Sequence, residues 1–117
     1  MKIAVFGQYY QSNTAEIAIK VVDFLKKNDV TILFEATFLN ILKEKEIVLD
    51  NFETYSSYEE LPTDTETLIS IGGDGTILKA ATFIRDKNIP IIGINAGRLG
   101  FLATVQFDKI EELLQKV

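Results

Sequence analysis

The residues best suited to chemistry in this chain are three glycines around one aspartate, in the run Gly72-Gly73-Asp74-Gly75-Thr76. Glycine has no Cβ, so the backbone can take positive φ and its N–H groups can approach a ligand closely. A helix that starts near Thr76 would add unpaired N–H groups and a positive dipole end, which together favour phosphate. Asp74 would repel phosphates unless it orients a hydroxyl or holds a metal ion. The combination indicates phosphoryl-transfer chemistry.

A simpler interpretation of this loop is a tight strand-to-helix turn in which Asp74 or Thr76 caps the helix. Three glycines around an aspartate exceed what a cap requires. The loop is not a Walker loop, because no Gly-Lys-Ser/Thr follows, and it lacks the Gly-x-Gly-x-x-Gly spacing of dinucleotide-binding turns. Lys79, one turn into the helix, either reaches a phosphate or is an ordinary solvated lysine.

Two further loops carry polar residues that could reach the same ligand. Asn95 and Arg98 belong to residues 95–102, after an apolar segment, and polar groups at the carboxyl end of a strand face the ligand crevice. Residues 8–14 offer hydroxyl groups at a helix start, with a faint similarity to the phosphate loop of flavodoxins. They lack its interior glycine, and a capped helix start with exposed tyrosines is the simpler interpretation.

Composition restricts the classes of function. The chain has 117 residues, a formal net charge of −5, no cysteine and no histidine. The acidic balance argues against a general nucleic-acid binder, and acid–base chemistry falls to carboxylates, lysine or tyrosine. No apolar run approaches the ~18 residues that cross a bilayer, and the apolar start at residues 1–6 is too short for a signal peptide. We expect a cytoplasmic protein. The charge of a polyphosphate ligand would be balanced by a divalent cation, by Lys79 and Arg98, or by protein outside this sequence.

The apolar pattern predicts strands that alternate with helices. Strands are expected at residues 2–7, 30–34, 67–71 and 90–95, and helices at 13–28, around 38–42, at 77–87 and at 107–117. Residues 47–66 are the least readable part, and we expect a loop with one helical turn there. The alternation predicts a three-layer, Rossmann-like α/β domain with a mainly parallel sheet, whose strand-end loops share one edge. The last helix lacks a glycine or proline stop, which suggests a fragment of a longer protein.

The loop at residues 72–76 and the segment at 95–102 together resemble the N-terminal domain of NAD kinases. The first motif is shared with 6-phosphofructokinases and with diacylglycerol and sphingosine kinases, whereas Asn-x-Gly-x-Leu-Gly-Phe-Leu is more particular to NAD kinases. The resemblance covers essentially the whole chain, residues 1–117, strongly from 67 to 104 and only by pattern before that. It implies the N-terminal α/β domain of a two-domain kinase. The C-terminal β-rich domain of that family, with its Asn-Glu ribose motif, is absent from this sequence. Family members commonly form dimers or tetramers.

The resemblance also implies an activity, the transfer of the γ-phosphoryl group of ATP to the adenosine ribose 2′-hydroxyl of NAD to make NADP. Asp74 would accept the hydroxyl proton, and a divalent cation such as Mg²⁺ would neutralise charge without an assigned protein ligand. We expect the substrates to contact Gly72, Gly73, Asp74, Gly75, Thr76, Lys79, Asn95 and Arg98. The missing domain puts catalysis by this chain alone in doubt.

Other interpretations stay open at this point. A lipid or sugar kinase of the same superfamily is disfavoured by residues 95–102. A flavodoxin-like electron-transfer module would bind FMN through residues 8–14, and a regulatory nucleotide-binding domain would have no catalysis of its own. The sequence leaves open the oligomeric state, the choice between ATP and polyphosphate as donor, and whether NADH is also a substrate.

Overall fold

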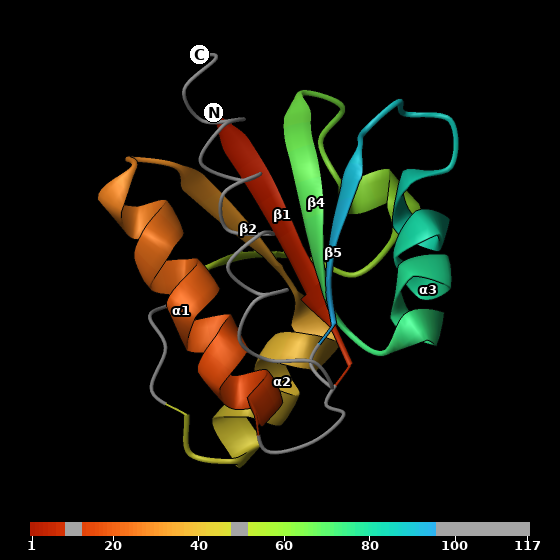
Figure 1. Cartoon of the computed structure of the whole chain (residues 1–117). Helices are drawn as coiled ribbons and strands as arrows, with labels where there is room; N and C mark the ends of the chain where they lie inside the picture. Colours follow the sequence, from red (N-terminus) through yellow and green to blue (C-terminus); the bar gives the residue numbers. More distant parts are fainter. Residues whose placement is uncertain (9–12, 48–51, 96–117) are drawn as a thin grey trace.

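A sheet of five parallel strands lies at the centre of the molecule (Figure 1). The computed structural model describes residues 1–8, 13–47 and 52–95, with only the backbone of Asn13, Asp74 and Asn95. The strands are β1 (Lys2–Gly7), β2 (Thr31–Glu35), β3 (Glu53–Tyr55), β4 (Thr65–Gly72) and β5 (Ile91–Asn95). Their spatial order, β3-β2-β1-β4-β5, is that of the classic doubly wound fold and not the flavodoxin order 2-1-3-4-5.

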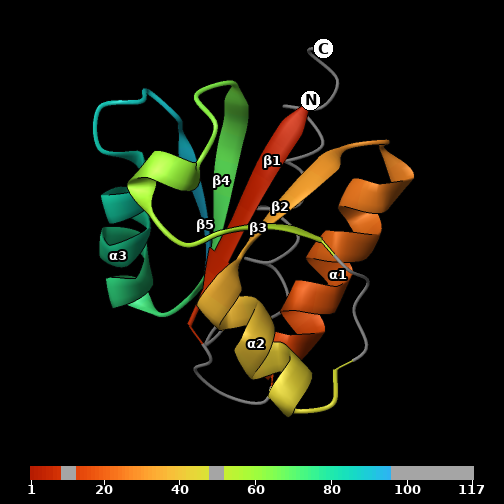
Figure 2. The ribbon, with the colours of Figure 1, turned by 180° about the vertical axis from the view of Figure 1, so that it is seen from behind.

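Helices cover both faces of this sheet (Figures 1 and 2). Helices α1 (Asn13–Lys27) and α2 (Ala36–Glu44) lie on one face, and α3 (Asp74–Ile84) with the short 3₁₀ helix η1 (Tyr58–Glu60) lies on the other. The chain adds strands from β1 through β2 to β3 in one direction and from β4 to β5 in the other. Because such crossovers are right-handed, the two halves place their helices on opposite faces. The central neighbours β1 and β4 form the topological switch point.

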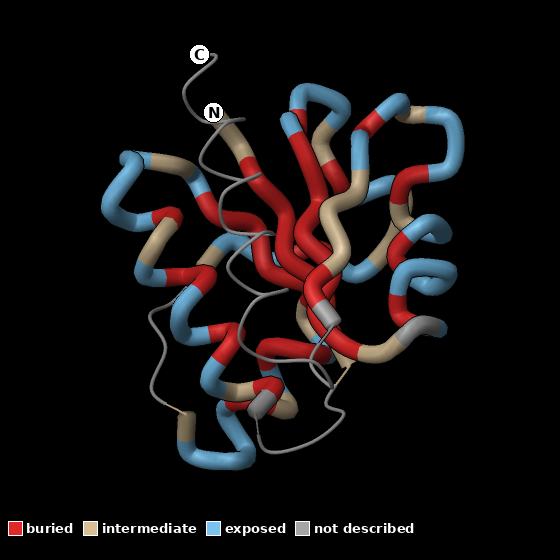
Figure 3. Tube along the Cα trace, viewed as in Figure 1, coloured by how far each residue is buried: buried red, intermediate tan, exposed pale blue. Residues whose placement is uncertain are grey.

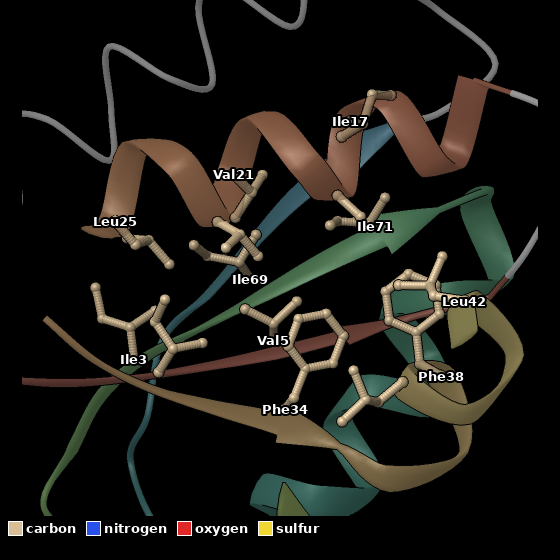
Figure 4. Close-up of a cluster of buried hydrophobic side chains, with 14 of the residues drawn as sticks. Ile3, Val5, Ile17, Val21, Leu25, Phe34, Phe38, Leu42, Ile69 and Ile71 are labelled. Atoms are coloured by element: carbon tan, nitrogen blue, oxygen red, sulfur yellow. The ribbon is translucent and has the colours of Figure 1, made fainter. Parts of the chain in front are cut away.

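The core fills the space between the sheet and its helices, and the inner strands are buried along most of their length (Figure 3). Ile17, Val21 and Leu25 recur at four-residue intervals in α1 and project toward the sheet (Figure 4). They cover alternate residues of the central strands, which are Ile3 and Val5 of β1 and Ile69 and Ile71 of β4. Burying each such side chain contributes about 1.5–3 kcal/mol.

Most of the expected elements are confirmed, with three corrections. The expected loop at 47–66 contains β3, which carries the exposed Glu53 and Thr54 and therefore gives no apolar run. Helix α3 begins at Asp74 instead of residue 77 and ends at Ile84 instead of residue 87. It stops early because Arg85 turns to a φ of +47°. The helix expected at 107–117 lies outside the described residues. Within those residues, no helix combines the length and apolar character needed to cross a membrane.

Candidate functional site

The carboxyl ends of β1 and β4 lie side by side at the lower edge of the sheet in Figure 1. Gly7 pairs with Ile71, and Gly72 pairs with Asn95 at the end of β5. Beyond β1, the backbone N–H of Gln8 donates to the carbonyl of Ile71 at 3.0 Å. The structure therefore brings the starts of all three predicted loops to one edge, whereas Arg98 lies outside the described residues.

The glycine-rich loop turns sharply from β4 into α3. Gly72 has a φ of +153°, a region that residues with side chains rarely adopt. Gly73 is the N-cap of α3, so the interpretation in which Asp74 or Thr76 caps the helix is wrong. Asp74, Gly75 and Thr76 instead form the first turn, so the helix begins three residues earlier than the expected residue 77. The N–H groups of Asp74 and Gly75 have no acceptor within a helix that starts here, and this leaves them available to a ligand.

A hydrogen bond joins this turn to the end of β1. The Thr76 hydroxyl donates to the side-chain oxygen Oε1 of Gln8 at 2.9 Å, and Thr76 is only 2% exposed. Gln8 is thus held at the switch point by its own backbone and by Thr76. Gln8 is not among the site residues predicted from the sequence. Its position directly after β1, at the carboxyl edge of the sheet where ligands bind, could have indicated it.

We expect Thr76→Val to lower the stability of the protein by about 1–3 kcal/mol, because the Gln8 oxygen loses the hydroxyl donor that the buried Thr76 supplies. Valine keeps the shape of threonine and removes only the hydroxyl. Thermal unfolding of the wild type, Thr76→Val and Thr76→Ser measures the effect. Serine keeps the hydroxyl and should lie nearer the wild type, and a valine variant as stable as the wild type would contradict the assigned contact.

Gly75 has no structural reason to be glycine. It is exposed in the first turn of α3, its φ is not in the positive range, and an added Cβ would meet nothing within 4 Å. Glycine in a helix costs about 1 kcal/mol relative to alanine. Glycine also serves where a ligand approaches the backbone closely, and this is the role we expect for Gly75.

We expect Gly75→Ala to raise the free energy of unfolding by about 0.5–1 kcal/mol and at the same time to weaken binding of a phosphate-bearing ligand. The added methyl group stabilises the helix and occupies the space over the N–H groups. Thermal unfolding and calorimetric titration with ATP measure the two effects. A variant that gains stability and binds ATP as the wild type does would show that Gly75 makes no room for the ligand.

A cavity of about 500 Å³ opens at the carboxyl edge of the sheet, between residues of α2 on one side and residues of α3 on the other. It runs from Gly7 and Gln8 at the switch point to Ser56 beyond the end of β3, and α3 supplies Lys79 and Thr82 as one wall. Lys79, predicted from the sequence as a candidate phosphate ligand, is exposed and lines this cavity. The structure therefore brings Lys79 to the same cavity as the end of β1.

Glu35 brings a buried negative charge to the same cavity. It ends β2, is 4% exposed, and accepts the backbone N–H groups of Thr37 and Phe38, each at 2.9 Å. Burial first, and then the charge of Glu35, raise the pKa of Tyr55, whose hydroxyl donates to the Val5 carbonyl at 3.0 Å. Glu35 is also not among the site residues predicted from the sequence, because there it is only the last residue before an expected helix.

No metal cage is formed by the part of the chain that the structure describes. Within residues 1–8, 13–47 and 52–95, no three carboxylates come together as a group that could hold a metal ion. Phosphate-carried Mg²⁺ does not need such a group, because it usually keeps its waters and binds one or two carboxylates together with substrate phosphates.

Comparison with known proteins agrees with this geometry. Residues 3–117 match the family described as ATP-NAD kinase N-terminal domain. The chain is 51% identical to the NAD kinase of Flavobacterium johnsoniae, 50% to that of Flavobacterium psychrophilum and 41% to that of Bacteroides fragilis. Each match covers 100% of this chain and 40% of the relative, so the chain spans less than half the length of these proteins. The chain belongs to the NAD kinase family and corresponds to its N-terminal α/β domain.

Proposed function

We propose that this chain is the phosphate-binding domain of an ATP-dependent NAD kinase, which transfers the γ-phosphoryl group of ATP to the adenosine ribose 2′-hydroxyl of NAD. The observation that carries the proposal is the loop at residues 72–76, which begins α3 at the β1–β4 switch point and has an open glycine at Gly75. Ligands of doubly wound sheets bind in the crevice at such a switch point.

The reaction needs positioning and charge stabilisation more than covalent chemistry by the protein. The ribose 2′-oxygen attacks the γ-phosphorus, the bond from that phosphorus to the β,γ-bridging oxygen breaks, and ADP leaves with the electron pair. Asp74 holds the hydroxyl and receives its proton. A carboxylate at a helix N-terminus is stabilised in its ionised form, so it is a weak base, and we expect the proton to move late. The N–H groups of Asp74 and Gly75 and the ammonium of Lys79 would hold phosphate oxygens.

A divalent cation fits this arrangement when the phosphates carry it. Mg²⁺ at phosphates usually binds one or two carboxylates, and the carboxylate of Asp74, a residue of the first turn of α3, would be one of them. Such an ion would neutralise the charge of the β- and γ-phosphates.

The family and the length of the relatives support further assignments for this chain and for the whole enzyme. Residues 1–117 would be one domain, and a C-terminal β-rich domain would supply most contacts to NAD. Asn95 and Arg98 would face that substrate. The whole enzyme would be a cytoplasmic dimer or tetramer with no membrane or nucleic-acid partner.

The choice of acceptor tests this proposal against the related lipid and sugar kinases. The full-length gene product is given ATP labelled in the γ-phosphate, Mg²⁺, and one of NAD, diacylglycerol or fructose 6-phosphate. We expect label in NADP and in neither other product. Label in a lipid or sugar phosphate, with none in NADP, would refute the proposed acceptor.

A further inference from the structure

The end of α3 is fastened to the connection between β3 and β4, which contains η1 and lies beside this helix (Figure 2). The ammonium of Lys87, three residues past the helix, donates to the carbonyl of Leu61 at 2.6 Å and also to the carbonyl of Tyr58. Tyr58 is the first residue of η1, and Leu61 directly follows it. One lysine side chain therefore holds both ends of η1 against the end of α3.

The side chain of Tyr58 is held by the same short turn. The Lys87 ammonium lies 4.1 Å from the centroid of the Tyr58 ring, and the guanidinium carbon of Arg85 lies 4.7 Å from it. The Tyr58 hydroxyl donates to the carboxylate of Asp86 at 2.7 Å. Cations over an aromatic ring are attracted to its face. Three consecutive residues thus surround one ring, and we call Tyr58 with residues 85–87 the Tyr58 clamp.

The backbone of the clamp is strained at its first residue. Arg85 has a φ of +47°, which is unfavourable for a residue with a Cβ and which glycine would adopt freely. The N–H of Arg85 donates to the Ala81 carbonyl at 3.0 Å, and that of Lys87 donates to the Ile84 carbonyl at 2.9 Å. Such strain persists only where the surrounding contacts outweigh it. The contacts to Tyr58 and Leu61 are those that this turn makes possible.

Helix α3 is consequently held at both ends. Its 11 residues span about 16 Å. The first turn is tied to the end of β1 by the hydrogen bond from Thr76 to Gln8, and the last turn leads directly into the Tyr58 clamp. Asp74 and Lys79, to which the proposed function assigns the substrates, belong to this helix. If the clamp opened, α3 could tilt and both residues would move.

We propose that Lys87 is a positioning residue for the phosphoryl transfer. Its ammonium fixes the C-terminal end of α3 to η1, and the rigid helix transmits this placement to Asp74 and Lys79 in its first half. Lys87 itself lies beyond the end of α3 that is opposite the phosphate loop, so it acts through the helix and not on the substrates. This inference rests on the proposed function, because that function assigns the substrates to α3.

The first test is the turnover of full-length Lys87→Met, measured well below the thermal midpoint of every variant so that unfolded protein does not contribute. We expect kcat for NADP formation to fall on the order of tenfold, since a misplacement of about 1 Å caused far from the chemistry can cost about 10²-fold. Lys87→Arg should restore most of it, because a guanidinium can donate to both carbonyls and stack on the ring. The control Lys20→Met, at an exposed position of α1, should keep wild-type kcat. Wild-type kcat in Lys87→Met would overturn the inference.

The second test asks whether Lys87 acts through the clamp. Tyr58→Leu removes the ring that Lys87 and Arg85 flank. Residues that act through one joint show non-additive effects. We therefore expect the double variant Tyr58→Leu, Lys87→Met to turn over little more slowly than Lys87→Met alone. Losses in kcat that multiply in the double variant would mean that the two residues act separately, and would contradict the clamp.

Amide hydrogen exchange separates this inference from the proposed function, because it needs no substrate. The N–H groups of residues 78–84 bond within α3, and their exchange reports how firmly the helix is held. We expect faster exchange there in Lys87→Met than in the wild type and in Lys20→Met. Faster exchange in a protein whose wild type forms no NADP would support the hold on α3 and count against the proposed function only. Unchanged exchange would overturn the inference even where NADP is formed.

Discussion

Replacing Asp74 with asparagine is expected to lower kcat for NADP formation by the full-length protein by about 10²–10⁴-fold. Asparagine keeps the shape of the side chain and removes the negative charge that, in the proposed function, orients the ribose hydroxyl and accepts its proton. Asp74 is the first residue of α3, where a neutral amide is also tolerated, so the fold should persist. The measurement is steady-state NADP formation, with KM for each substrate and a circular dichroism spectrum of each variant.

The matched control for this change is Asp23→Asn, which removes a carboxylate from an exposed position on α1. We expect the control to keep wild-type kcat. A folded Asp74→Asn variant that retains a tenth or more of wild-type turnover would contradict the catalytic role proposed for Asp74.

Gly72→Ala is expected to lower the thermal midpoint by about 5–10 °C and to reduce activity. A Cβ at this position would come within 2.4 Å of the Thr76 hydroxyl oxygen, and the φ of +153° is unfavourable for alanine. To relieve the clash, α3 must shift away from β4 or Thr76 must leave Gln8, and either change displaces the turn at residues 72–76. The comparison is thermal unfolding of the variant beside the wild type.

Gly75→Ala is the natural control, since it adds the same methyl group three residues later, where nothing lies within 4 Å. The two alanine variants should move the midpoint in opposite directions. Equal midpoints would mean that the turn at Gly72 relaxes easily and that its conformation does not position α3.

The fold class and most of the site's elements follow from the sequence because their signals are local. The apolar runs at 2–7 and 67–71 are buried on both faces, so each reads as a continuous strand. The glycines at 72–76 mark a turn directly after such a strand. Parallel pairing then requires the strand-end loops to share an edge, as they do.

The parts that could not be predicted depend on contacts between distant segments. Strand β3 is held by Tyr55, whose hydroxyl reaches Val5 across 50 positions of sequence, and its other residues are exposed. Gln8 becomes a site residue only because Thr76 meets it from another loop. Glu35 enters the cavity because β2 pairs with β1, a neighbour relation that no local pattern specifies.

The start of α3 illustrates a different kind of error. The apolar periodicity begins at Ile77, which placed the predicted helix too late. The true first turn is made of Asp74, Gly75 and Thr76, residues that favour turns over helices by intrinsic preference. Local preference and structure disagree here at the residues proposed to bind phosphate, as is common where function sets the sequence.

NADP formation from NAD, ATP and Mg²⁺, measured on the full-length gene product and on residues 1–117 alone, tests the central claim most directly. We predict that the full-length protein makes NADP and that residues 1–117 alone make little or none, because the proposed function assigns most contacts to NAD to a further domain. A folded full-length protein that forms no NADP would contradict the assignment of this site to an NAD kinase.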